Sequence, residues 1–183
     1  MAEEETPAPV SVALEWLPWH VGARTRIETA FAGGRLPHGL LLHGPDGVGK
    51  EHFATVLAAG LFCSGRRHGL TPCGECPECA LSRAASHPDL HWLRRPEDKK
   101  SIGVDAVREA CDQLAMTSMR GGYRVAIVTP ALKHLRREIA QPGQAVVGVI
   151  AVARYRVCLR RQQEVAVLGH EQEDQPVDQP QQL

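Results

Sequence analysis

The chain has 183 residues, of which 43% are hydrophobic, so it can bury a sizeable folded core. Its 21 basic and 21 acidic residues give a formal net charge of zero, which excludes nucleic-acid binding driven by overall charge. Aromatic residues make up 4% of the chain, which argues against a base-stacking surface for single strands.

The first segment is acidic and proline-rich (MAEEETPAP), and we expect residues 1–13 to form a flexible leader. It lacks the basic and apolar regions of a signal peptide, and no run approaches the about 20 apolar residues that span a bilayer. We therefore expect a cytoplasmic protein without membrane contact. In a reducing compartment, closely spaced cysteines favour metal binding or redox chemistry over structural disulfides.

Apolar periodicity predicts helices that alternate with short buried strands over residues 14–131. The expected helices cover residues 19–31, 51–62, 77–85 and 102–116, and the expected strands cover residues 39–43, 89–93 and 123–128. This alternation predicts an α/β fold with a parallel sheet flanked by helices. In the helix over 102–116, we expect the core-facing stripe to comprise Val104, Val107, Cys111 and Leu114.

A phosphate-binding loop is predicted between the first strand and the next helix. The residues Gly44, Pro45, Asp46, Gly47, Val48, Gly49 and Lys50 match the pattern G-x-x-x-x-G-K in the context that the motif requires. Glycines let the backbone approach phosphates, and the amides at the helix start attract their charge. The alternative is a vestigial loop that is kept as a structural turn.

Two positions of this nucleotide site carry unexpected residues. The residue after Lys50 is normally Ser or Thr, whose hydroxyl binds Mg²⁺, but here it is Glu51. The strand over 123–128 should end on an acidic residue that holds the metal, and the chain reads Val128-Thr-Pro-Ala131 instead. The sequence therefore predicts a degenerate nucleotide site that does not hydrolyse ATP.

Four cysteines form a cluster after the loop's helix. Cys63, Cys73, Cys76 and Cys79 follow the pattern C-x9-C-x2-C-x2-C, and four thiolates complete a tetrahedral shell around zinc without an open position. A redox pair, an iron–sulfur cluster and free cysteines are the alternatives. The position of Cys63 at a helix end favours a structural zinc module over residues 63–79.

The motifs together resemble a known family. Arg35–Lys50, Cys63–Cys79, His87–Leu93, Ser101–Leu114 and Gly121–Ala131 occur in the order seen in the delta-prime subunits of bacterial DNA polymerase III clamp loaders, which are AAA+ proteins. The resemblance covers about residues 18–131, and the gamma/tau subunits share the phosphate loop and the zinc module.

The resemblance implies a role in DNA replication. It implies assembly with delta and gamma/tau subunits, and contact through that complex with the sliding clamp and primed DNA. The complex belongs to a DNA-directed DNA polymerase holoenzyme, a nucleotidyltransferase, while the chain itself is expected to be non-catalytic. The alternatives are an active P-loop ATPase of gamma/tau type, a zinc-stapled interaction module, and a truncated product without function.

The resemblance ends at Ala131. Residues 132–183 form a divergent tail that is rich in Gln, Glu, Asp and Pro near its end, and we expect partial disorder there. The family would continue with further strands and a helical collar. Our hypothesis is that a frameshift or a mis-called gene end has replaced that continuation with unrelated sequence.

Overall fold

The computed structural model describes residues 12–66, 68–96, 102–120 and 122–129, together with the backbone of 145–154 and 165–168. A short 3-10 helix (η1, Pro18–His20) precedes the first α-helix. The α-helices are α1 (Val21–Ala32), α2 (Lys50–Phe62), α3 (Pro77–Arg83) and α4 (Val104–Ala115). The strands are β1 (Gly39–Gly44), β2 (Leu90–Arg94), β3 (Tyr123–Thr129), β4 (Ala145–Arg154) and β5 (Val165–Leu168). Every element predicted between residues 14 and 131 is confirmed, with ends shifted by no more than two residues.

The strands form one sheet in the order β2-β3-β4-β1-β5. The pairs β2–β3 and β1–β5 are parallel, whereas β4 is antiparallel to both β3 and β1. The predicted α/β class is confirmed, but the sheet is mixed because one strand in the tail runs against the other four. Apart from β4 and β5, the predicted tail over 132–183 lies outside the described residues.

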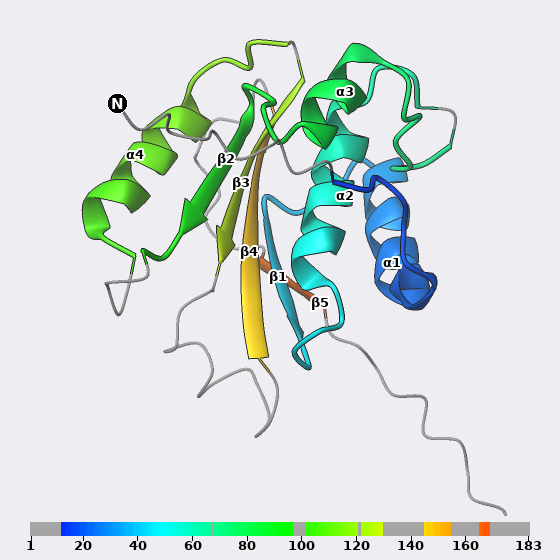
Figure 1. The fold of residues 1–183 in the computed structure, drawn as a ribbon, viewed down its shortest axis with the longest axis horizontal. Helices are drawn as coiled ribbons and strands as arrows, with labels where there is room; N and C mark the ends of the chain where they lie inside the picture. Colours follow the sequence, from blue (N-terminus) through cyan, green and yellow to red (C-terminus); the bar gives the residue numbers. More distant parts are fainter. Residues whose placement is uncertain are drawn as a thin grey trace, which may run out of the picture.

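Helices cover both faces of the sheet. Figure 1 shows α4 on one side of the strands and α1, α2 and α3 on the other. The larger core lies under α2, which has buried residues all round because it is enclosed by the sheet and the neighbouring helices. Its buried residues include Phe53, Leu57 and Leu61, which pack with strand residues Leu40 and Ile127.

Helix α4 packs through only part of the predicted face, together with a residue outside the predicted stripe. Ala110 is its buried residue, and it packs with Leu93 and Ala126 of the sheet. Val104 is 65% exposed and Val107 is 44% exposed, and Cys111 is also exposed, so the core role predicted for these three residues is wrong. Leu114 is partly buried against this cluster, so its predicted core role is confirmed. Three of the four residues of the predicted stripe therefore face solvent.

Candidate functional site

The predicted phosphate loop connects a buried strand to a buried helix. Strand β1 ends at Gly44 and helix α2 begins at Lys50. Gly47 and Gly49 adopt φ values of 85° and 77°, a left-handed backbone that favours glycine. The sequence therefore folds into the strand–loop–helix arrangement that the motif requires.

The side chain of Lys50 folds back onto the backbone of the phosphate loop. Its buried ammonium group donates a 2.8 Å hydrogen bond to the carbonyl of Gly44 and a second one to the carbonyl of Pro45. Its Nζ atom also lies 4.0 Å from a carboxylate oxygen of Asp46. These contacts hold the ammonium charge beside the first residues of the loop.

The segment before α1 holds the outer side of the loop. The carbonyl oxygen of Val48 lies 3.0 Å from Nε1 of Trp19, which donates to it, and 3.1 Å from Nε2 of His20. Because the peptide is trans, the N–H of Gly49 points away from these two rings. A Cβ atom on Gly49 would lie 2.8 Å from Cδ1 of Leu17, so this segment also needs glycine there. Burial lowers the pKa of His20, which favours its neutral form.

The two unexpected residues of the nucleotide site contact each other. Thr129, the last residue of β3, donates a 2.6 Å hydrogen bond from Oγ1 to Oε1 of Glu51 in the first turn of α2. Thr129 is buried, and Glu51 is exposed. A carboxylate and a hydroxyl thus meet beside the loop, each on the element where a metal-binding loop carries the other.

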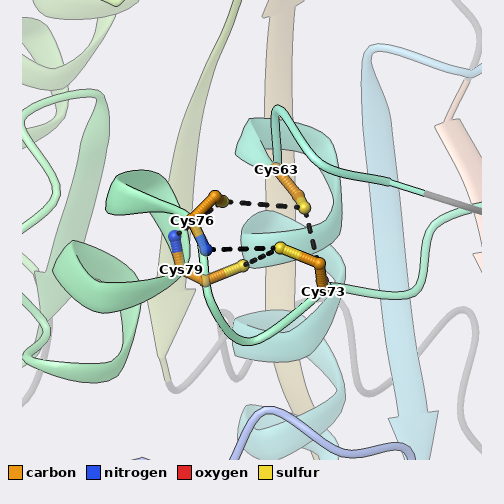
Figure 2. Close-up of side chains that lie close together, drawn as sticks. All are labelled: Cys63, Cys73, Cys76 and Cys79. Atoms are coloured by element: carbon orange, nitrogen blue, oxygen red, sulfur yellow. Dashed lines mark hydrogen bonds between the residues drawn. The ribbon is translucent and has the colours of Figure 1, made fainter.

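The four predicted metal ligands lie together beside the end of α2. Figure 2 shows the sulfurs of Cys63, Cys73, Cys76 and Cys79 pointing toward one another, and the four Sγ atoms all lie within 4.8 Å of one another. The Cys73–Cys79 pair is 3.9 Å apart and the Cys63–Cys76 pair is 3.8 Å apart. A tetrahedron with metal–sulfur bonds of about 2.3 Å has edges of about 3.8 Å, so the four residues fit one tetrahedral ion.

Backbone amides point at three of these sulfurs. The N–H groups of Cys73, Cys76 and Cys79 donate to the sulfurs of Cys63, Cys73 and Cys76, over 3.3, 3.4 and 3.4 Å. Burial acts to raise the pKa of Cys76, but hydrogen bonds from Cys79 and Ser64 outweigh it and lower that pKa to about 5. Such N–H donors stabilise thiolate charge, which is the form that binds metal.

Burial has the opposite outcome at two of the cysteines. It raises the pKa of Cys63 and that of Cys79, which are both fully enclosed. Hydrogen bonds from the backbone of Glu75 and Cys76 also lower the pKa of Cys73, so the cluster combines two easily ionised thiols with two that resist ionisation. Burial is the main cause of the two raised pKa values, and the neighbouring charge of Cys63 adds to it at Cys79.

A close backbone approach joins the cysteine module to α2. A Cβ atom on Gly60 would lie 1.9 Å from the carbonyl oxygen of Leu70, so the loop before Cys73 packs directly on the helix. Glu28 of α1 accepts a 3.1 Å hydrogen bond from the N–H of Leu70. The module is thus built into the fold.

Polar contacts also join helix α3 of the module to the segments that precede β2 and β3. Glu78 of α3 lies 2.8 Å from Nη2 of Arg120 and 3.0 Å from Nε2 of His87. The ring of His87 stacks on Phe62, the last residue of α2, with 3.8 Å between centroids and 6° between planes. Sequence reasoning gave His87 no role, because its partners are distant in the chain.

A known protein family matches most of the described part of the chain. The family model for "DNA polymerase III, delta subunit" matches residues 20–138, which is more than half of the chain. The chain belongs to this family. The match runs through the phosphate loop, the four cysteines and β3.

Curated relatives carry related names. The chain is 36% identical over 112 residues to "DNA polymerase III subunit delta'" of Yersinia pestis, which covers 61% of the chain and 33% of that relative. It is 41% identical over 101 residues to the same subunit of Pseudomonas aeruginosa, over 54% of the chain and 30% of the relative. "DNA polymerase III subunit gamma/tau" of Mycobacterium tuberculosis is 31% identical over 158 residues, 82% of the chain and 24% of the relative. The chain thus spans about a third of the length of the delta' relatives. Among the described residues, no helix is long and apolar enough to cross a bilayer.

Proposed function

We propose that the chain acts as a delta-prime-type subunit of the DNA polymerase III clamp loader and takes part in DNA replication. One observation carries the proposal: the family match runs through a phosphate loop whose metal-binding positions hold Glu51 and Thr129. A subunit of this kind assembles with delta and gamma/tau and helps place the sliding clamp on primed DNA. Bacterial replication takes place in the cytoplasm, and we place the protein there.

Within this function the nucleotide site is degenerate. The preformed loop and Lys50 supply phosphate-binding groups, but a hydroxyl after Lys50 and an acid at the end of β3 are both replaced. Magnesium would be poorly held, so hydrolysis would be negligible. The chain then contributes structure to the complex, and its partners supply the ATPase activity.

We assign a structural zinc ion to the four cysteines. The 3.8 and 3.9 Å sulfur separations support a single tetrahedral ion. An iron–sulfur cluster binds its cysteines through different iron atoms, which would hold the sulfurs farther apart. Four thiolates leave no coordination position for water, so the ion would stabilise the fold without catalysing a reaction.

Assembly is the test of this function. The purified full chain is mixed with the delta and gamma/tau subunits of the same organism and separated by size exclusion, with an unrelated P-loop protein of similar size as the control. The proposal predicts co-elution of the chain, but not of the control, with the two subunits. A folded, metal-loaded chain that elutes alone would contradict it.

The second candidate is an active ATPase subunit of gamma/tau type. The gamma/tau subunit of Mycobacterium tuberculosis aligns over 82% of the chain, and Lys50 is in place. This alternative predicts Mg²⁺-dependent ATP turnover that Lys50→Ala abolishes. Absence of turnover in the wild-type chain would dismiss it.

A further inference from the structure

The contact between Glu51 and Thr129 joins two elements that are far apart in the sequence. Thr129 donates to Glu51 over 2.6 Å across 78 residues, and it ends the strand next to β2. The carbonyl of Thr129 also accepts a 3.2 Å hydrogen bond from the N–H of Arg95, so its backbone is held on the other side. The backbone hydrogen bond from Arg95 therefore helps to position the Thr129 hydroxyl for its hydrogen bond to the Glu51 carboxylate.

The two substitutions are coupled. A metal-binding phosphate loop uses a hydroxyl at the helix start and a carboxylate at the strand end. Here the helix supplies the carboxylate of Glu51 and the strand supplies the hydroxyl of Thr129, and the two groups bond to each other. The hydroxyl and the carboxylate are thus both present, but each lies on the element where the other is expected, and they are hydrogen-bonded to each other.

The position of Glu51 sets its effect on the loop. It lies in the first turn of α2, where the amide ends of the helix favour negative charge. A phosphate bound in the loop would use the same favourable field. A fixed carboxylate in this turn offsets that field and repels an incoming anion.

We propose that the Thr129–Glu51 hydrogen bond is a self-inhibiting contact that keeps Mg²⁺-nucleotide out of the phosphate loop. Thr129 holds the Glu51 carboxylate at the start of α2, where it acts as a built-in anion. The bond also engages the hydroxyl and the carboxylate that would otherwise be offered to a cation. This inference rests on the proposed function, because it explains why the nucleotide site of such a subunit is inactive.

Exchange of the two side chains tests the inference. Binding of ATP to the full chain is measured by titration calorimetry with Mg²⁺ and with a chelator, for the wild type, Glu51→Thr and the double variant Glu51→Thr/Thr129→Asp. We expect about tenfold or greater tightening for the double variant, dependent on Mg²⁺, and a smaller gain for the single variant. Glu109→Gln, which removes a charge from exposed α4, is the matched control and should bind as the wild type does.

The Glu51→Gln variant guards against misfolding of the exchanged chain. Gln keeps an oxygen that accepts from Thr129 but lacks the charge, so it should also bind ATP more tightly than the wild type. Wild-type binding as tight as that of the exchanged variant would overturn the inference. So would the absence of any gain in folded variants, as judged by circular dichroism and metal content. Assembly with delta and gamma/tau is a separate readout, so failure of the proposed function would be seen independently.

Discussion

Asp89 and Arg124 form a buried ion pair, with 3.0 Å between Oδ1 and Nε. Asp89 is fully enclosed and Arg124 is 4% exposed. The carboxylate also accepts hydrogen bonds from the hydroxyl of Ser118 and the N–H of Met119, over 2.8 and 2.9 Å. Burial acts to raise the pKa of Asp89, but the N–H of Met119 and the guanidinium of Arg124 outweigh it and hold that pKa below its ordinary value. This network ties the residue before β2 to the start of β3.

Asp89→Asn should lower the free energy of unfolding by about 3 kcal/mol or more, because it leaves the Arg124 charge buried without a partner. Urea denaturation at neutral pH measures the change. Asp105→Asn is the control, since Asp105 forms a fully exposed pair with Arg108 over 3.5 Å and should change stability little. Equal losses of unfolding free energy in the two variants would show that the buried pair stabilises the fold no more than the exposed pair does.

Gly60→Ala should destabilise the protein by more than about 2 kcal/mol, because the new methyl would lie 1.9 Å from the carbonyl oxygen of Leu70. Gly22→Ala in α1 is the matched control: no neighbouring atom lies within 4 Å of its Cβ. That change should stabilise the helix by up to about 1 kcal/mol. Thermal denaturation of both variants gives the comparison, and a neutral Gly60→Ala would contradict the close packing of the cysteine module on α2.

Cys63→Ser should reduce bound zinc from one ion per chain to almost none and lower the melting temperature, because it removes one of four converging thiolates. Elemental analysis of the purified protein measures the metal. Cys111→Ser should leave metal content unchanged, since Cys111 is exposed on α4 and outside the cluster. Iron in place of zinc, or zinc retained by Cys63→Ser, would refute the assignment.

The pKa of His87 should lie below its ordinary 6.5, because burial disfavours the imidazolium more than Glu78 and Asp89 favour it. Its neutral form then contributes stability above about pH 6.5, and this contribution is lost as the pH falls through the lowered folded-state pKa. Titration of the imidazole signals by NMR measures the value. Glu78→Gln should lower this pKa further, since it removes a charge that raises it while Arg120 continues to lower it. A rise after that change would contradict the geometry.

Local patterns predicted the loop and the cysteine cluster well. The loop depends on glycine spacing between a strand and a helix, and the cluster depends on cysteines within 17 positions of one another. Both are short-range signals that the backbone must satisfy locally. The strand–helix alternation likewise predicted the α-helices and strands described before residue 130, but not the short 3-10 helix η1.

Long-range contacts were not predictable in the same way. The hydrogen bond between Glu51 and Thr129 and the pair between Asp89 and Arg124 join residues 78 and 35 positions apart. Periodicity identified α4 but not which of its residues would be buried, because apolar spacing did not single out Ala110, which packs with the sheet. The sequence of β4 shows no clear apolar period, so neither the strand nor its antiparallel direction was predicted.

A clamp-loading assay tests the central claim most directly. The delta and gamma/tau subunits, the sliding clamp, primed DNA and ATP are combined with and without the full chain, and clamp bound to DNA is counted. The account predicts that loading depends on the chain and is unchanged by Lys50→Ala, because the chain itself does not use ATP. Loading that is the same without the chain, or that Lys50→Ala abolishes, would contradict the account.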